Sequence, residues 1–291
     1  MADAPGHLLG QLIGGILETA TEPVLRELAA KHGLYVDTKG PRPGVRKGQL
    51  LTLLDSDGNK HDLDFVVERG GTAEGVGSYA AFVECAWRRL TKHSKAKAQE
   101  IQGAVLPLLS RWSNIGPIPA AVVAGKWSRP SIKQLETCGF VVLQLDFDST
   151  VEVFEGFGIN IKGPEDIPSD KIPDSFWATQ NQRWQALSNV ELAKMASALR
   201  NTNKDDFASF SAELEARIIR TVSIVKFHPV HGCSYELGSI ELAIDAMHAY
   251  DSSVTHPLIR FEFEVIYTNG DSIRGAYSSI EAAEEFLRRL L

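Results

Sequence analysis

The sequence predicts an α/β protein in which helices cover a central sheet. Short apolar runs typical of buried strands alternate with stretches whose apolar residues recur every three or four positions, as in amphipathic helices. Hydrophobic residues make up 44% of the chain and charged residues 23%, an ordinary globular mixture that excludes disorder, collagen and coiled coil as the main class. The length of 291 residues suits one large domain or two modest ones.

The first residues predict a helix, then a second helical stretch. Apolar side chains from Leu8 to Ala20 fall on one stripe. Pro23 suits the first position of the second stretch, and Gly33 is a natural stop. Residues 39–48 have the glycine and proline content of a loop, which carries four positive charges, on Lys39, Arg42, Arg46 and Lys47.

Two strand-like runs follow, over residues 49–54 and 61–68, with a polar turn between them. A glycine-rich loop then leads to a third run, over residues 79–86. The segment from Gly71 to Gly77 offers glycines for holding a phosphate, but no helix starts after it at the right place. A flexible loop is the plainer interpretation of this segment.

The next part of the chain predicts a helix over residues 94–109 and a buried strand over 120–124. A helix over 131–137, ended by Gly139, and a strand over 140–145 complete the alternation. On a helical wheel, the buried stripe of the first of these helices consists of Ala98, Ile101, Val105 and Leu108.

From residue 161 the composition changes, and prolines among polar residues indicate a linker or an extended surface connection. We therefore expect an α/β core over residues 1–160 and an extension over 161–291. The extension has helical stretches near 180–199 and 205–220, and then a C-terminal β-hairpin and helix. Asn269-Gly270 is the favoured two-residue hairpin turn, and no internal repeat is apparent.

Composition also limits the function. The net charge of −7 argues against a protein that coats nucleic acid without specificity. Three scattered cysteines suit neither a disulfide framework nor a cysteine zinc site, and no apolar run approaches the roughly 20 residues needed to cross a bilayer. The start lacks the positive region of a signal peptide, so we expect a soluble, cytoplasmic protein.

Two carboxylates stand inside apolar strand runs. Asp64 lies in His-Asp-Leu-Asp-Phe-Val-Val-Glu and Glu84 in Ala-Phe-Val-Glu-Cys-Ala-Trp. A carboxylate in such a place is costly to desolvate unless a cation or hydrogen bonds satisfy it. Mg²⁺ needs only one or two protein carboxylates beside a substrate phosphate, so the pair predicts a Mg²⁺ site. The alternative is that each carboxylate caps or pairs on an exposed strand face.

The order helix, strand with Asp64, loop, strand with Glu84, helix resembles the PD-(D/E)xK nuclease superfamily, over roughly residues 1–150. The phrases that carry the resemblance are 61–68, 82–89 and the helix 95–102. The resemblance implies a restriction-endonuclease-like mixed sheet flanked by helices, in which Asp64 and Glu84 bind the metal. It also implies a lysine two residues after Glu84, where this chain has Ala86.

The missing lysine means either an inactive site or a lysine supplied from elsewhere. On the helix that follows, Lys97 lies at the edge of the buried stripe, on the same flank as Glu100. We therefore expect Lys97 to act as the catalytic lysine, the alternative being a solvated surface residue. Glu18 or Glu22 on the first helical stretch is a candidate for a further carboxylate.

Residues 88–97 carry a charge of +5 with no acid, so the rest of the chain carries −12. The cations are Arg88, Arg89, Lys92, Lys95 and Lys97. A basic segment beside a carboxylate pair suits phosphodiester cleavage, because cations hold the polyanion while the carboxylates need a metal. We expect Arg88, Arg89, Lys92 and Lys95 to contact nucleic acid, with a solvated basic face as the alternative.

These observations together predict a Mg²⁺-dependent endonuclease that cuts double-stranded DNA, of the type II restriction or phage-defence kind. Cleavage of both strands predicts a homodimer. The alternative is a catalytically inactive nuclease-fold protein that binds nucleic acid or serves in an assembly, which Ala86 favours.

Overall fold

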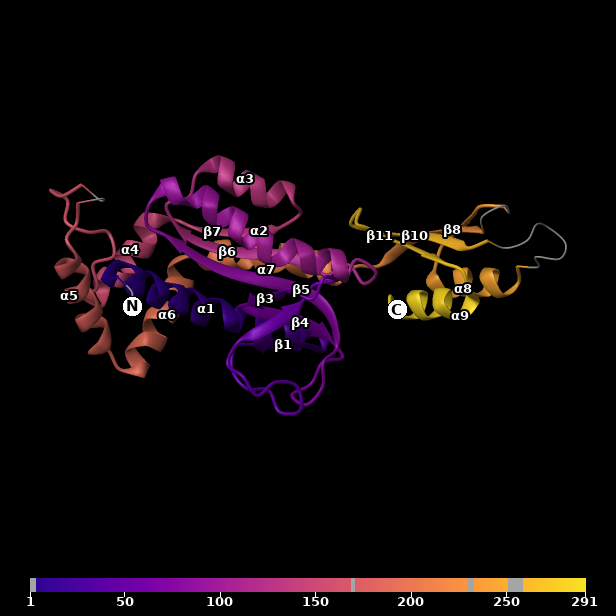
Figure 1. The fold of residues 1–291 in the computed structure, drawn as a ribbon, viewed down its shortest axis with the longest axis horizontal. Coiled ribbons are helices and arrows are strands. Elements are labelled where there is room, and N and C mark those ends of the chain that lie inside the picture. The colour runs from indigo at the N-terminus through magenta and orange to yellow at the C-terminus, as the bar shows by residue number, and fades with distance from the viewer. Residues whose placement is uncertain (1–3, 169–170, 230–232, 251–258) are drawn as a thin grey trace.

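The computed structural model describes residues 4–168, 171–229, 233–250 and 259–291. A five-stranded mixed sheet in the order β1-β4-β5-β6-β7 forms its centre (Figure 1). Neighbours are antiparallel from β1 to β5 and parallel from β5 to β7. The α/β prediction with helices flanking a sheet is confirmed. The strands are β1 (Leu34–Thr38), β4 (Phe65–Arg69), β5 (Ser78–Arg88), β6 (Ile118–Gly125) and β7 (Val141–Leu145).

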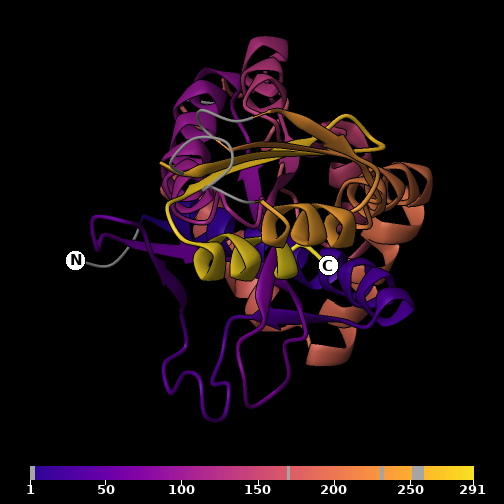
Figure 2. The ribbon, with the colours of Figure 1, turned by 90° about the vertical axis from the view of Figure 1, so that its right-hand side faces the viewer.

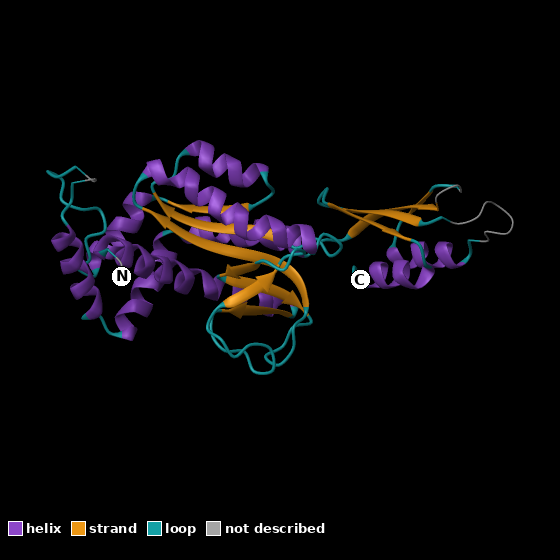
Figure 3. Cartoon of the chain, in the orientation of Figure 1, coloured by secondary structure: helices purple, strands orange, loops and turns teal. Residues whose placement is uncertain are grey.

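Helices cover both faces of this sheet (Figure 3). On one face, α2 (Ser94–Arg111) and α3 (Arg129–Thr137) share an apolar cluster with the strands. The predicted buried stripe of α2 is confirmed. On the other face, α1 (Pro5–His32) and α4 (Phe147–Gly156) lie in a second apolar cluster.

The N-terminal helix α1 is continuous, so the prediction of a second stretch opening at Pro23 is wrong. Leu17, Thr21, Leu25 and Leu28 continue one buried stripe across the proline. Packing of this stripe outweighs the single backbone hydrogen bond that a proline removes from a helix interior.

The apolar run over residues 61–68 forms two strands rather than one. β3 (Lys60–Leu63) pairs with β2 (Leu51–Leu54) in a separate two-stranded sheet, and β4 of the main sheet begins at Phe65. Asp64 is the residue at the break, where the chain passes from one sheet to the other.

Three helices follow the proline-rich connection where two were expected. They are α5 (Asp174–Gln185), α6 (Asn189–Thr202) and α7 (Lys204–Ile218). A capping box between Ser188 and Glu191 starts α6 and so divides the helical stretch. Buried side chains of all three helices belong to the same apolar cluster as α1 and the sheet. The division of the chain between residues 160 and 161 stays a prediction.

The last part of the chain has its own sheet, in the order β11-β10-β8-β9, and its own apolar core. Figure 2 looks at this unit from the front and shows two helices side by side on one face of its sheet. The elements are β8 (Val222–Pro229), β9 (Tyr235–Leu237), α8 (Ile240–His248), β10 (Phe261–Tyr267), β11 (Ser272–Tyr277) and α9 (Ile280–Arg288).

The predicted hairpin is β10–β11, but its turn has three residues, not two. Tyr267 N–H donates to Asp271 O at 2.9 Å, and Gly270 N–H donates to Tyr267 O at 3.0 Å. Gly270 has a φ of 89°, which glycine adopts at little cost. Asn269 and Gly270 therefore belong to a three-residue turn that ends in a left-handed glycine, the hairpin connection next in frequency after the two-residue turn.

The C-terminal unit also contains a repeat that the sequence did not make apparent. The strand–strand–helix unit β8-β9-α8 recurs as β10-β11-α9, and β8 and β10 lie next to each other at the centre. Ser239-Ile-Glu begins α8 just as Ser279-Ile-Glu begins α9, and each serine caps its helix. Val225 faces Val265 across the central pair, 40 residues apart like the two serines, so a pseudo-twofold axis relates the halves.

Candidate functional site

Asp64 and Glu84 lie side by side at the end of the β4–β5 ladder. Its last antiparallel pair is Phe65 with Val83, and Asp64 precedes Phe65 while Glu84 follows Val83 in the sequence. Asp64 Oδ2 accepts a hydrogen bond from the Cys85 N–H at 2.7 Å, which fixes the carboxylate against β5. Two acidic residues therefore lie close together at the end of the β4–β5 ladder.

Glu84 is the less satisfied member of the pair. Its Oε1 atom is buried and has no hydrogen-bond partner within the described residues. Burial raises the pKa of Glu84 well above its ordinary value, and the negative charge of Asp64 raises it further. The charges of Lys97 and Lys39 oppose this rise without cancelling it. The site thus contains a buried acid with one oxygen that has no hydrogen-bond partner.

A third carboxylate and a lysine complete the group. Lys39 lies just after β1, and its Nζ is 2.7 Å from Asp64 Oδ1 and 2.7 Å from Glu18 Oε1 of α1. Burial raises the pKa of Glu18 and Asp64 adds to this, while Lys39 acts in the opposite direction. Burial lowers the pKa of Lys39, but the two carboxylates outweigh it and the net shift is upward. Of the two helix glutamates expected as candidates, Glu18 joins the site.

The sequence alone could not show that Glu22 lies outside the site and Lys39 inside it. Glu22 instead pairs with Arg26 on the surface of α1, at 2.6 Å. Lys39 was grouped only with a basic loop, and its sequence neighbours gave no sign of a carboxylate partner. Short-range spacing could not reveal the role of Lys39 either, because its partners Glu18 and Asp64 lie 21 and 25 positions away along the chain.

Lys97 lies near this group, on the second turn of α2. Its side chain is 17% exposed and forms an ion pair with Glu100. Arg88, from the end of β5, approaches the same glutamate at 3.5 Å. Lys97 lines the same cleft as Ala86, the position where the resemblance puts the missing lysine.

A cleft of about 520 Å³ is lined by Glu18, Lys39 and Lys97, whereas Asp64 and Glu84 are not among its lining residues. Its wall from α1 presents Gly6, Gly10 and Gly14, of which the last two leave open space where a side chain would be. Arg89 also lines the cleft, and its guanidinium lies 4.6 Å from the ring centroid of Trp177. The titratable side chains on the lining are His7, Glu18, Lys39, Cys85, Arg88, Arg89, Lys97 and Glu100.

The basic segment is divided by this cleft. Arg88, Arg89 and Lys97 line it, whereas Lys92 and Lys95 are exposed and are not part of its lining. Burial lowers the pKa of Arg88 and of Arg89. The two arginines are therefore partly desolvated cations on the cleft, while the two lysines are exposed.

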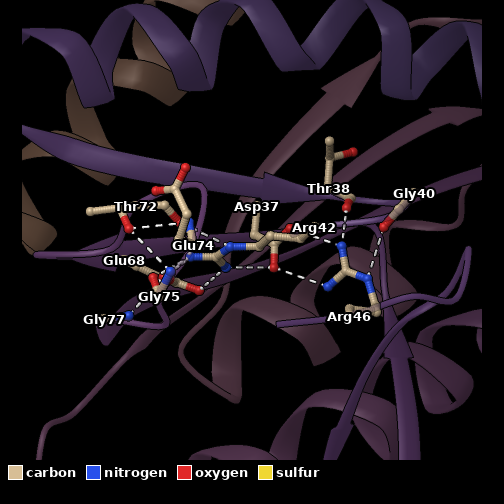
Figure 4. Close-up of polar contacts among 10 residues, drawn as sticks. All are labelled: Asp37, Thr38, Gly40, Arg42, Arg46, Glu68, Thr72, Glu74, Gly75 and Gly77. Carbon is tan, nitrogen blue, oxygen red and sulfur yellow. Dashed lines mark hydrogen bonds and ion pairs between the residues drawn. The ribbon is translucent and has the colours of Figure 1, made fainter. Parts of the chain in front are cut away.

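The second basic patch expected around residues 39–48 is not a free cationic surface. Arg42 is 3% exposed and makes a bidentate pair with Glu68, at 2.8 and 2.9 Å, and a bond to Asp37 at 2.8 Å. Arg46 makes two bonds to Asp37, at 2.9 and 3.0 Å. Figure 4 shows this chain of two arginines and two carboxylates, in which both arginines of the patch are paired within the protein.

The glycine-rich loop is held by the same network. Thr72 O and Gly75 O accept from Arg42 Nη2, at 2.6 and 2.7 Å, and Gly77 N–H donates to Glu68 at 2.9 Å (Figure 4). A Cβ on Gly77 would lie 2.2 Å from Arg69 O, so the backbone passes too closely for any other residue. The segment is a loop, as expected, and these hydrogen bonds tie it to β4; its flexibility stays a prediction.

The chemistry of the site fits Mg²⁺ in part. Carboxylate oxygens are the ligands Mg²⁺ prefers, and Glu84 Oε1 is a buried oxygen in need of a cation. Across the described ranges, however, no three His, Cys, Asp or Glu side chains are already grouped to hold a metal ion. An ammonium, that of Lys39, occupies the shared place between Glu18 and Asp64.

Comparisons with known proteins assign no family. No protein-family model matches the sequence, and no curated protein matches it. A solved structure of a protein of unknown function, AF1548, is similar over 70% of this chain and 98% of that chain, with 12% identity and a TM-score of 0.28. A similarity this weak carries no argument about fold or function. Within the described residues, no helix has the length and apolar character to cross a membrane.

Proposed function

We propose that this protein is a Mg²⁺-dependent endonuclease acting on double-stranded DNA, of the restriction or phage-defence kind, with a restriction-endonuclease-like core. One observation carries the proposal: Asp64 and Glu84 lie together at the end of the β4–β5 ladder, and Lys39, which pairs with Asp64, lines a cleft together with two arginines and Lys97. That combination suits a reaction in which a polyanion must be brought to a pair of acids.

Each side chain has a role in this proposal. Asp64 and Glu84 hold the metal, and the Cys85 N–H keeps Asp64 in one orientation. Mg²⁺, when bound, lowers the pKa of a water molecule and offsets the negative charge of the phosphate. Lys97 orients or deprotonates the attacking water, and Arg88 and Arg89 hold the phosphates that flank the cleaved bond.

The test is cleavage of supercoiled plasmid and phage DNA with Mg²⁺, Mn²⁺ or EDTA. We expect metal-dependent nicking by the parent and its loss in Asp64→Asn and Glu84→Gln. Glu136→Gln, a change of the same kind on the exposed surface of α3, is the matched control and should cut like the parent. Parent activity that is absent with every metal, or unchanged in Asp64→Asn, would refute the proposal.

Two observations favour a second candidate, a catalytically inactive nuclease-fold protein that binds nucleic acid. Ala86 stands in the cleft where a lysine is expected, and Lys39 already neutralises Asp64. This candidate predicts DNA binding without cleavage and without an effect of metal. An electrophoretic mobility shift with the same variants separates the two, and gel filtration with light scattering tests the proposed homodimer.

A further inference from the structure

We propose that Lys39 is a positioning residue of the site: its ammonium is an internal counter-ion for Glu18 and Asp64 that a divalent cation must displace. The inference rests on the proposed function, because it concerns metal binding at Asp64. It assigns a role to a residue outside the sequence motif, and it explains how a site for a cation can stay folded while no cation is bound.

Contact distances carry the first step. Asp64 has two oxygens, and each has a partner: Oδ2 accepts from the Cys85 N–H and Oδ1 pairs with Lys39 Nζ, both at 2.7 Å. The same ammonium is 2.7 Å from Glu18 Oε1. A metal ion that takes Asp64 as a ligand must therefore compete with Lys39 for Oδ1.

The backbone at Lys39 is fixed, which carries the second step. Arg46 Nη2 donates to Thr38 O at 2.7 Å, and Arg46 Nε donates to Gly40 O at 2.9 Å, so one guanidinium holds the carbonyls on both sides of Lys39 (Figure 4). Arg46 is itself held by Asp37. The network of Arg42 and Arg46 thus points the lysine at the carboxylates.

The side chain can leave although its backbone cannot. Lys39 is 41% exposed at its side chain and lies on the cleft, and a lysine stem has four rotatable bonds. Displacement therefore needs no backbone change and moves the ammonium into the cleft that Arg88 and Arg89 also line. There the freed charge adds to the positive charge of Arg88 and Arg89, so metal entry and substrate attraction become coupled.

Calorimetric titration of the full-length protein with Mn²⁺ tests the competition between the metal ion and Lys39. Lys39→Met removes the ammonium and keeps the stem, and we expect it to bind Mn²⁺ at least tenfold more tightly than the parent. Lys133→Met, on the exposed surface of α3, is the matched control and should stay within twofold. Equal or weaker binding by Lys39→Met overturns the inference.

A second measurement uses the unmodified chain and does not depend on the folding of a variant. Acetylation of lysines, quantified by mass spectrometry, should increase severalfold at Lys39 when Mn²⁺ is added, while Lys133 stays constant. Unchanged labelling of Lys39 at a Mn²⁺ concentration that saturates the parent overturns the inference. If the parent binds Mn²⁺ and Asp64→Asn does not, the proposed function survives that failure; if neither binds, both fall.

Discussion

The buried guanidinium of Arg42 offers the sharpest test of how this fold is held together. Arg42→Met keeps most of the side-chain volume and removes the charge. The change leaves Glu68 with the Gly77 N–H as its remaining hydrogen bond among those described above, and leaves Asp37 with Arg46 alone. It also removes the donor for two loop carbonyls, those of Thr72 and Gly75.

The expected loss is large because a buried charge without its partner is costly. Removing one member of a buried ion pair typically destabilises a protein by about 3–5 kcal/mol. With a urea dependence of roughly 2–3 kcal/mol per molar, the unfolding midpoint should fall by roughly 1–2 M. All five tryptophans lie between residues 87 and 184, so their fluorescence reports on the sheet and its covering helices and not on the C-terminal unit.

Two further variants distinguish the charge argument from a general loss of packing. Arg26→Met breaks an exposed pair with Glu22 and should cost less than about 1 kcal/mol. The double variant Arg42→Met/Glu68→Gln removes the stranded carboxylate and should be more stable than the sum of its single changes predicts. If Arg42→Met unfolds at the same urea concentration as Arg26→Met, the proposed role of this network is wrong.

Three other predictions follow from the structure. Glu84→Gln in EDTA should be more stable than the parent at pH 7, because the amide has no charge to desolvate. Since the folded state raises the pKa of Glu84 above 4.5, the parent loses stability as the pH rises from 4.5 through the folded pKa, and the advantage of the variant should vanish below 4.5 in pH-dependent urea titrations. Asp37 has the opposite sign: burial raises its pKa, but hydrogen bonds from Arg46 and Arg42 outweigh this and lower it, so its stabilisation should be present above pH 3.8 and be lost as the pH falls through the folded pKa, a loss that Asp37→Asn should not show. Gly103→Ala, in open space on α2, should raise the free energy of unfolding by about 0.5–1 kcal/mol, whereas Gly125→Ala should lower it by more, because its φ is 95° and a Cβ would lie 2.2 Å from Arg88 O; equal thermal midpoints for the two variants would contradict this.

Local pattern was enough for the elements that bury one continuous stripe. The spacing of Ala98, Ile101, Val105 and Leu108 predicts the buried face of α2, and the structure has it. The apolar runs likewise predict β5, β6 and β7, because strands buried on both faces need no alternation. These predictions succeed because one element contains all the information they use.

Predictions failed where tertiary contacts overrule the local signal. Pro23 reads as a helix start, but burial on both sides of it keeps α1 continuous. The run over residues 61–68 reads as one strand, but its halves pair with different partners and break at Asp64. The repeat in the C-terminal unit was missed because few positions beyond the helix starts, Ser-Ile-Glu, are alike in sequence.

The candidate site divides in the same way. Asp64 and Glu84 were predictable as a pair, because strand runs on either side of a loop set their facing register. The choice of a third carboxylate could be narrowed only to Glu18 or Glu22, because the direction in which a helix face points depends on what the helix packs against. Lys39 was invisible: a lysine in a basic loop is ordinarily solvated.

Lys39 differs from the two arginines of its loop in the partners that it contacts. Arg42 and Arg46 carry the same charge in the same loop, yet both turn inward to Asp37 and Glu68, and Arg46 holds the carbonyls beside Lys39. Arg42 and Arg46 therefore stabilise the loop itself, and Lys39 contacts the carboxylates of the site. Because this depends on which acids each cation reaches, a charge count cannot predict it. Arg46→Met should accordingly weaken the hold on Lys39 and raise its acetylation in metal-free protein, whereas Lys47→Met should leave that labelling unchanged; equal labelling in both variants would show that the clamp does not position the lysine.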